Sequence, residues 1–336
     1  MPESPLTVLV LGGTAWLGGR LCREALDRGH SVSCLARGES GTAPDRTTLF
    51  RADRRSADAY DAVRHRDWDA VVDLTWQPGL ARSALAALRA RAGHWVYVSS
   101  CSVYASHATP GADETAQLLA PTDLDEVGID LYGEAKVACE LACRSGGETN
   151  LLLARSGLIG GPGDGSDRAG YWVARAERDR LAPMLVPDSP HGVTQVMDVR
   201  DLAAWLVDCI EQRTAGVYDA VGPLMPLPEW IDLSRRIGGH TGPVLRAEDA
   251  WLLAQGVAEF MGPGSLPLWL ADPDWRAFCA RSGAAAVEAG LKHRPTEHML
   301  TDILAWEREL GLDRERRSGL SPGRETELLH KLTRAG

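Results

Sequence analysis

The sequence predicts an α/β fold in which a doubly wound parallel sheet is followed by a smaller, mostly helical C-terminal lobe. Its 336 residues are enough for one large or two small domains with a sizeable core. In the first half, short continuous apolar runs alternate with helical stretches, as in parallel sheets covered on both faces. After about residue 165 this alternation breaks off. These patterns favour a sheet domain with a second part attached to it.

Six apolar runs in the first half are expected to form strands. The run at 6–11 is continuous and ends in glycines, which is typical of a strand buried on both faces. The other runs span 31–35, 47–52, 70–74, 95–99 and 151–153. Helices are predicted at 16–28, where apolar residues recur at helical spacing, and at 80–91 and 131–144. Alternation of this kind implies right-handed crossovers between parallel strands.

In the second half, strands and helices no longer alternate regularly. Residues 163–192 are rich in Gly, Asp and Arg, with a helical patch at 171–180. Residues 193–197, a helix at 200–212 and residues 216–221 are expected to return to the sheet. From residue 223 onward the chain is expected to be helical. The predicted division is therefore 1–165 together with 193–222 for the sheet domain, and 166–192 together with 223–336 for the lobe.

Charge and cysteine content exclude several classes of protein. The 46 acidic residues exceed the 36 basic ones, which argues against a nucleic-acid partner. No apolar run approaches the roughly 18 residues of a membrane span, and no basic region precedes the first apolar stretch, as a secretory signal requires. The seven cysteines are scattered without a CxxC pair. We expect reduced thiols in a cytoplasmic protein without a metal site.

A glycine-rich turn lies between the first strand and the first helix. Its residues are Gly12, Gly13, Thr14, Ala15, Trp16, Leu17 and Gly18. Glycines there let the backbone approach a pyrophosphate, and the helix N-terminus presents unpaired N–H groups to it. We predict that Gly12, Thr14, Ala15, Trp16, Leu17 and Gly18 bind a dinucleotide. The alternative is a turn of the same kind without a ligand.

The end of the second strand bears on which dinucleotide binds. An acidic residue there would bond the ribose hydroxyls of NAD, but this chain has Arg37 and no carboxylate before Glu39. Arg37 would pair with the 2′-phosphate of NADP, so NADP is the predicted cofactor and NAD the alternative. Asp53, which follows the third strand, is a candidate contact to the adenine amine. The alternatives are a solvated arginine and a turn-forming aspartate.

A tyrosine and a lysine four residues apart suggest acid–base chemistry. Tyr132 and Lys136 open the helix predicted at 131–144, one turn apart on the same face. An ammonium beside a phenol favours the phenolate, which a tyrosine needs in order to move protons near neutral pH. Only three of the 36 basic residues are lysines, so chance placement of this pair is a poor explanation. The alternative is an ordinary surface pair.

These motifs resemble the extended short-chain dehydrogenase/reductase superfamily, whose members have a Rossmann fold, and in particular its epimerase/dehydratase-like and atypical members. The resemblance covers residues 6–222 and extends more loosely to 310. It rests on the segments 12–18, 99–104 (Ser-Ser-Cys-Ser-Val-Tyr), 132–136, 161–164 (Gly-Pro-Gly-Asp) and 195–201. It implies that Ser100 bonds the substrate oxygen and Tyr132 passes the proton. It also implies that Lys136 holds the nicotinamide ribose and that the lobe binds a small-molecule substrate.

Two departures narrow the implied function. Sugar-nucleotide dehydratases of this kind carry Asp-Glu directly after the catalytic hydroxyl, where this chain has Cys101 and Ser102. Many nucleotide-sugar epimerases carry an asparagine at the position of Leu158. Our main hypothesis is therefore a reductase acting on a carbonyl or alcohol of a small metabolite, with secondary metabolism as its context. The alternatives are a sugar or nucleotide-sugar epimerase with tightly bound NAD(P), and a non-catalytic dinucleotide sensor.

Several other positions are open. His107, Tyr171 and His191 are candidate substrate contacts, because they lie in predicted loops or near their ends. The tryptophans of the second half either line a substrate cleft or pack in the core. A homodimer is expected by analogy with similar folds.

Overall fold

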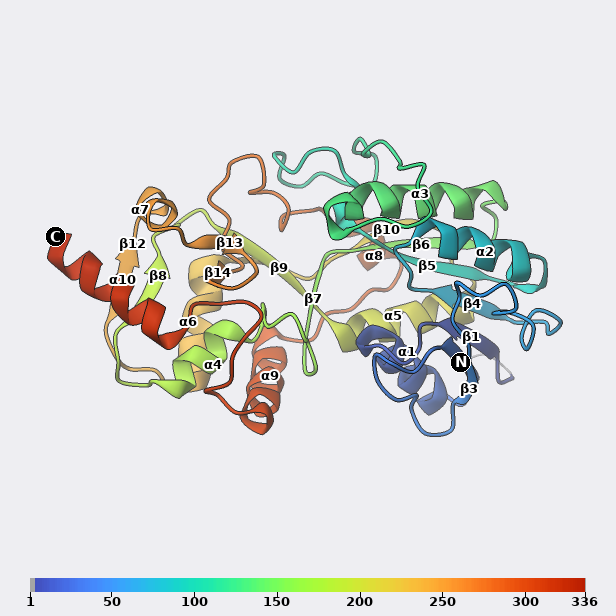
Figure 1. Ribbon diagram of the computed structural model, residues 1–336, viewed down its shortest axis with the longest axis horizontal. Coiled ribbons are helices and arrows are strands. Elements are labelled where there is room, and N and C mark those ends of the chain that lie inside the picture. Colours follow the sequence, from blue (N-terminus) through green and yellow to red (C-terminus); the bar gives the residue numbers. More distant parts are fainter. Residues whose placement is uncertain (1–3, 336) are drawn as a thin grey trace.

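The computed structural model describes residues 4–335 and divides into two parts. A large parallel sheet with its helices forms one part, and a smaller lobe at the opposite end contains the C-terminal helix (Figure 1). Strand β9 (Val193–Asp198) and strand β7 (Leu158–Gly160) run between the two parts (Figure 1). Within residues 4–335, no helix combines the length and the apolar character that a membrane crossing needs.

The main sheet has seven parallel strands in the order β10-β6-β5-β4-β1-β2-β3. Their bounds are β1 Thr7–Leu11, β2 Ser31–Ala36, β3 Thr48–Arg51, β4 Ala70–Asp73, β5 Trp95–Ser100, β6 Leu151–Ser156 and β10 Gly216–Ala220. The order reverses direction between β1 and β4, so a topological switch point lies at the carboxyl ends of these two strands. The predicted doubly wound parallel sheet is confirmed.

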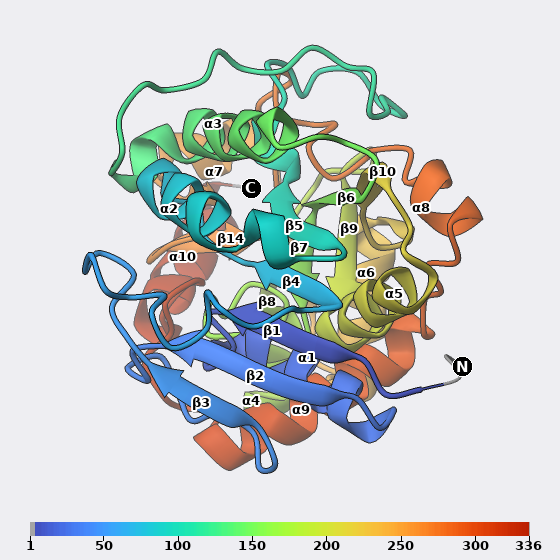
Figure 2. The same ribbon diagram turned by 90° about the vertical axis from the view of Figure 1, so that its right-hand side faces the viewer.

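Helices cover both faces of this sheet, and the strands alternate between them. Val8 and Val10 share one core with α1 (Trp16–Asp27) and α5 (Val199–Gln212). Leu9 and Leu11 share another with α2 (Pro78–Leu88) and α3 (Tyr132–Ser145). The two pairs of helices lie on opposite sides of the sheet (Figure 2). Successive strand residues point to opposite faces, which explains why the strands read as unbroken apolar runs.

One strand that we expected in the main sheet lies outside it. β9 pairs in parallel with β7 and antiparallel with β11 (Leu224–Pro226), in a separate three-stranded sheet. The prediction that 193–197 returns to the main sheet is therefore wrong, whereas β10 does return to it. An apolar run predicts a buried strand, but it does not specify which strand it pairs with.

The lobe surrounds a core rich in tryptophan. Trp172, Trp230 and Trp269 are fully buried there. Its helices are α4 Tyr171–Arg178, α6 Leu227–Gly238, α7 Asp249–Ala254, α9 Thr296–Leu310 and α10 Pro322–Ala335. Four short strands add to them, namely β8 Met184–Pro187, β12 Val244–Ala247, β13 Ala258–Phe260 and β14 Ser265–Pro267. At three or four residues, these strands are too short for alternation to predict them.

A segment that we assigned to the lobe lies against the sheet domain instead. Helix α8 (Ala284–Glu288) is close to β10 (Figure 1). Ala286 and Leu291 are buried in the core beneath α1 and α5, and the Trp205 indole N–H donates to the carbonyl of Ala289 at 3.1 Å. The chain therefore crosses from the lobe to the sheet and back between residues 270 and 296.

Candidate active site

The glycine-rich turn has the close packing that its sequence predicts. Gly12 has a φ of +97°, a conformation that favours glycine. A Cβ on Gly18 would lie 2.4 Å from the carbonyl oxygen of Gly12, so only glycine lets α1 begin this close to β1. No side chain caps α1 at Ala15, which leaves the first N–H groups of the helix for a ligand. The turn therefore fits the pyrophosphate of a dinucleotide.

A groove of about 290 Å³ runs along the carboxyl ends of β1, β2 and β3. Among the predicted cofactor-binding residues, its lining includes Gly12, Thr14, Ala15, Arg37 and Asp53. Trp16, Leu17, Gly18 and Lys136 do not line it. The groove has the position expected for the adenosine half of a dinucleotide, between the glycine-rich turn and the end of β2.

The charges in this groove are more numerous than the sequence indicated. Arg37 is about half exposed, and its Nη1 lies 3.1 Å from Oε2 of Glu39. Asp53 accepts a hydrogen bond from the backbone N–H of Arg55 at 3.0 Å, as a turn-forming aspartate does. Arg55 also lines the groove, and the guanidinium of Arg51 approaches Gly38. Arg37 and Arg55 therefore line the groove and Arg51 lies next to Gly38, while Arg55 also pairs with Glu126.

Trp16 links the glycine-rich turn to the turn that follows β7. Its indole N–H donates to the carbonyl of Pro162 at 2.9 Å, and a Cβ on Gly163 would lie 2.8 Å from the indole nitrogen. The Gly-Pro-Gly-Asp turn that follows β7 therefore packs directly on the start of α1. The similarity of these two turns to family motifs predicts each of them, but their contact appears only in the tertiary structure.

Tyr132 and Lys136 lie together at the start of α3. The Lys136 ammonium is buried, 5.9 Å from the centre of the Tyr132 ring and 4.8 Å from that of Tyr97. It donates to the carbonyl oxygens of Thr75 at 2.9 Å and Val98 at 2.7 Å, which follow β4 and belong to β5. Two of its three N–H bonds are thus used, and one remains for a ligand.

Ser100 reaches the same place from the end of β5. Its hydroxyl accepts from the backbone N–H of Ser102 at 3.1 Å. A Cβ on Gly133 would lie 2.4 Å from the carbonyl oxygen of Ser102. The start of α3 therefore packs on the turn after β5 only because residue 133 is glycine, which brings the Tyr132 backbone beside this turn. Sequence reasoning identified Ser100 and Tyr132 but missed Gly133.

Trp76 was also missed. It follows β4 and contacts the ring of Tyr132, with 5.6 Å between ring centres. Its position just beyond an apolar run, after a strand next to the switch point, was the available signal. Trp76 restricts the positions open to the Tyr132 ring, and Tyr132 is half-buried.

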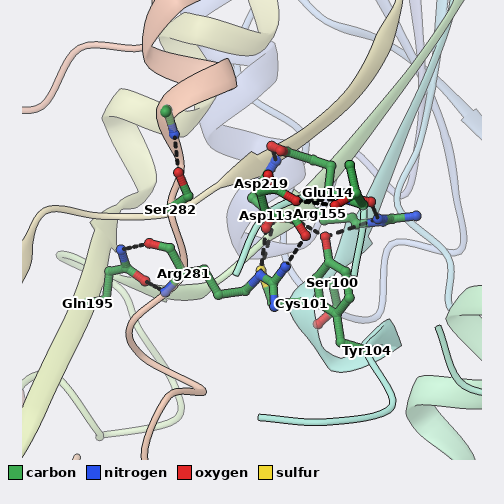
Figure 3. Close-up of polar contacts among 12 residues, drawn as sticks. Ser100, Cys101, Tyr104, Asp113, Glu114, Arg155, Gln195, Asp219, Arg281 and Ser282 are labelled. Carbon is green, nitrogen blue, oxygen red and sulfur yellow. Dashed lines mark hydrogen bonds and ion pairs between the residues drawn. The ribbon is translucent and has the colours of Figure 1, made fainter. Parts of the chain in front are cut away.

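A buried ionic network lies beneath Ser100 (Figure 3). Arg155 on β6 forms a two-pronged ion pair with Glu140 of α3, at 3.0 and 2.8 Å, and donates to the Tyr104 hydroxyl at 3.0 Å. The Tyr104 hydroxyl donates in turn to Asp219 of β10 at 2.5 Å. All four side chains are nearly inaccessible to solvent. The network fixes the turn after β5, which carries Ser100, to the neighbouring strands.

Arg281 extends this network toward the lobe. Its Nε donates to Asp219 at 2.5 Å, and its guanidinium lies 3.4 Å from the centre of the Tyr104 ring. Its backbone N–H and carbonyl exchange hydrogen bonds with the side-chain amide of Gln195 on β9, at 3.1 and 2.9 Å (Figure 3). The segment that crosses between the two parts is therefore anchored at residue 281 by buried polar groups.

Two of the positions at which the sequence departs from the family pattern, Cys101 and Leu158, are buried, whereas Ser102 is partly exposed. Cys101 is inaccessible, its thiol contacts the carbonyl of Arg155, and burial raises its pKa well above the usual value. Leu158 packs in the core of the lobe. Cys101 therefore has no acid–base function at neutral pH, and Leu158 offers no polar contact to a ligand.

The three candidate substrate contacts lie in different surroundings. Tyr171 is buried in the core of the lobe, edge-on to Trp172, so its assignment as a substrate contact is wrong. Its place at the start of a helix with an apolar face was the signal against it. His191 is exposed in the turn before β9. His107 stacks on Trp275 at 4.8 Å, and burial lowers its pKa to about 4.

Comparison with known proteins agrees with this geometry. The model of the NAD dependent epimerase/dehydratase family matches residues 8–220, which is more than half of the chain. No curated protein matches the sequence.

Solved structures show the same fold along nearly the whole chain. UDP-N-acetylglucosamine 4-epimerase from Bacillus cereus is 16% identical, with 91% of this chain and 98% of that one covered and a TM-score of 0.65. UDP-glucose 4-epimerase from Thermus thermophilus, in complex with NAD, is 16% identical, with 90% and 98% covered and a TM-score of 0.63. WbmG from Bordetella bronchiseptica, in complex with NAD and UDP, is 17% identical, with 92% and 97% covered and a TM-score of 0.66. The chain belongs to the NAD-dependent epimerase/dehydratase family, and it is an enzyme of that type with a nicotinamide dinucleotide as cofactor.

Proposed function

We propose that this enzyme epimerises a secondary alcohol of a sugar or nucleotide sugar. Tyr132 removes the proton from the substrate hydroxyl, and Ser100 holds the same oxygen. Lys136 uses its remaining N–H to bind the cofactor ribose. Bound NAD(P) supplies the hydride acceptor. The ketone would then turn its other face toward the cofactor, the hydride would return to that face, and Tyr132 would return the proton to the oxygen.

The anchored lobe is the observation that carries this proposal. An epimerase must retain its ketone between two hydride transfers, so the site has to stay closed around the intermediate. The buried pair between Arg281 and Asp219 ties the crossing segment to the sheet. The likeness to UDP-sugar epimerases through both parts of the chain supports the same conclusion. Elimination of water is disfavoured, because Cys101 replaces a carboxylate.

The test is incubation with UDP-sugars that carry deuterium at the reacting carbon. Epimerisation should proceed with the label retained and without net consumption of dinucleotide. Tyr132→Phe should lower the rate about 100-fold or more. Tyr218→Phe is the matched control. Tyr218 lies on the edge strand β10, and its hydroxyl donates to the carbonyl of Ala215 just before that strand. Label exchange with solvent, or full activity of Tyr132→Phe, would refute the proposal.

An NADPH-dependent reductase is the second candidate, and the groove favours it. Arg37, Arg51 and Arg55 offer a cationic site for the 2′-phosphate of NADP. We expect NADPH to bind at least about tenfold more tightly than NADH, and Arg37→Ala to remove most of the difference. Fluorescence titration measures both affinities. Stoichiometric NADPH oxidation with a ketone, and no dinucleotide copurifying with the protein, would favour the reductase over the epimerase.

We also propose that the protein is a homodimer formed through α2 and α3. These helices make the outer layer on one face of the sheet (Figure 2). Two large apolar side chains here are strongly exposed, Leu141 of α3 at 49% and Ile129, shortly before α3, at 75%. Sedimentation should give a mass twice that of the chain, and Leu141→Glu should give the monomer. A monomeric wild-type protein would contradict this assignment.

A further inference from the structure

Arg168 lies in the segment between β7 and α4, which leads from the sheet domain into the lobe. It follows the Gly-Pro-Gly-Asp turn, which Trp16 holds against the glycine-rich turn. The contact of Trp16 with this turn therefore holds the start of the segment that carries Arg168 beside the predicted dinucleotide site.

The guanidinium of Arg168 is incompletely paired. Its Nε donates to the Ser166 hydroxyl at 3.1 Å, and neither terminal nitrogen has an acceptor among residues 4–335. Within the same residues it forms no ion pair, whereas Arg155, Arg175 and Arg281 each pair with a carboxylate. Burial lowers the pKa of Arg168 from its usual value. The Arg168 guanidinium has lost part of its hydration, and no carboxylate of the described residues pairs with it to compensate for that loss.

Asp164, a carboxyl group that acts electrostatically on Arg168, is a poor counter-ion. Asp164 accepts from the backbone N–H of Ser166 at 2.8 Å, and its other oxygen is buried without a hydrogen bond in the described chain. Burial raises the pKa of Asp164, which disfavours its charged form. The terminal N–H groups of Arg168 therefore remain available to a ligand.

An aromatic row forms one wall beside this guanidinium. Arg168 lies over the ring of Phe260, 5.3 Å from its centre. Phe260 contacts Phe278 at 5.5 Å, Phe278 contacts His107 at 4.9 Å, and His107 stacks on Trp275. The row limits water on this side and strengthens a charge interaction at Arg168. Trp275, at its far end, is 47% exposed.

We propose that Arg168 determines substrate specificity by binding an oxyanion of the substrate, a phosphate or carboxylate group. The planar guanidinium offers two parallel N–H donors, the arrangement that these anions bind best. Leu158, buried in the lobe, supplies no polar contact, so the anion has to be bound by another residue. This inference rests on the proposed function, because it places the reacting alcohol at Tyr132 and the anion toward the lobe.

Equilibrium binding tests this without turnover. Calorimetric titration with UDP, glucuronate and inorganic phosphate separates the anion sources, and uridine is the neutral control. At least one anion should bind, and Arg168→Gln should weaken it at least tenfold, with Arg168→Lys intermediate. Arg246→Gln, which removes an exposed charge of the lobe, should change nothing. NADPH titration of each variant reports that the fold and the cofactor site are intact.

The outcomes separate the two proposals. Tight UDP binding lost in Arg168→Gln identifies a diphosphate, and glucuronate binding lost in the same way identifies a carboxylate. Unchanged anion affinity in Arg168→Gln, or no binding of any anion to the wild type, overturns the assignment. Loss of epimerisation in Tyr132→Phe with anion binding intact supports the proposed reaction and leaves the assignment of Arg168 unchanged. Absence of epimerisation in a wild-type protein that binds anions through Arg168 refutes only the reaction.

Discussion

Replacement of Arg281 by methionine should destabilise the protein and loosen the lobe. Methionine retains much of the side-chain volume but leaves Asp219 with the Tyr104 hydroxyl as its remaining side-chain donor. Both members of the ion pair are almost fully buried, at 4% and 0% exposure. Removal of one partner from a buried pair costs about 3–5 kcal/mol. With an unfolding entropy of about 2.1 cal/mol/K per residue, this predicts a Tm lowered by about 4–7 °C.

The pH dependence of this effect has a definite sign. Burial raises the pKa of Asp219, while its bonds to Tyr104 and Arg281 lower it. Without Arg281 the pKa of Asp219 rises further. A carboxyl group whose pKa is raised by folding stabilises the folded protein only while it is protonated. This stability is lost as the pH rises through the raised pKa. The stability difference between Arg281→Met and the wild type should therefore be largest at neutral pH and shrink on acidification.

Urea denaturation of four proteins measures the pair directly. The wild type, Arg281→Met, Asp219→Asn and the double variant form a double-mutant cycle. We expect the double variant to be less destabilised than the sum of the single variants by about 1 kcal/mol or more, because it contains no unpaired carboxylate. Additive effects, or an Arg281→Met protein within about 0.5 kcal/mol of the wild type, would show that this network does not hold the lobe.

Three further substitutions test the site. Gly133→Ala, whose Cβ would lie 2.4 Å from the Ser102 carbonyl, should lower turnover at least tenfold in steady-state assays and leave dinucleotide affinity unchanged. Gly18→Ala should weaken dinucleotide binding in a titration, since its Cβ meets the backbone of Gly12. Normal NADPH affinity would contradict the predicted pyrophosphate site. Burial lowers the pKa of His107 to about 4, so folding favours neutral imidazole and stability falls on acidification. His107→Phe should lose less stability than the wild type between neutral pH and pH ~4, and an identical loss would refute this.

The patterns that predicted the site are local ones. The glycine-rich turn, Ser100 and the Tyr132–Lys136 pair each lie within a few residues of a strand end or helix start. Parallel strands present their carboxyl ends at one edge, so these motifs converge wherever the sheet forms. Tyr171 was assigned wrongly because nearness to a loop in sequence does not indicate which way a helical side chain points.

By itself, the sequence predicted the alternation of strands and helices in the first half, the parallel sheet and a candidate acid–base pair, Tyr132 and Lys136. These properties depend on periodicity and spacing over short stretches of chain. The tertiary structure alone decided the pairing of β9 with β7, the return of residues 284–291 to the sheet and the burial of Arg281 on Asp219. It also placed Arg168 beside Phe260, without an ion pair to any of the described residues. Such contacts join residues far apart along the chain, and competition among all the packed surfaces selects them.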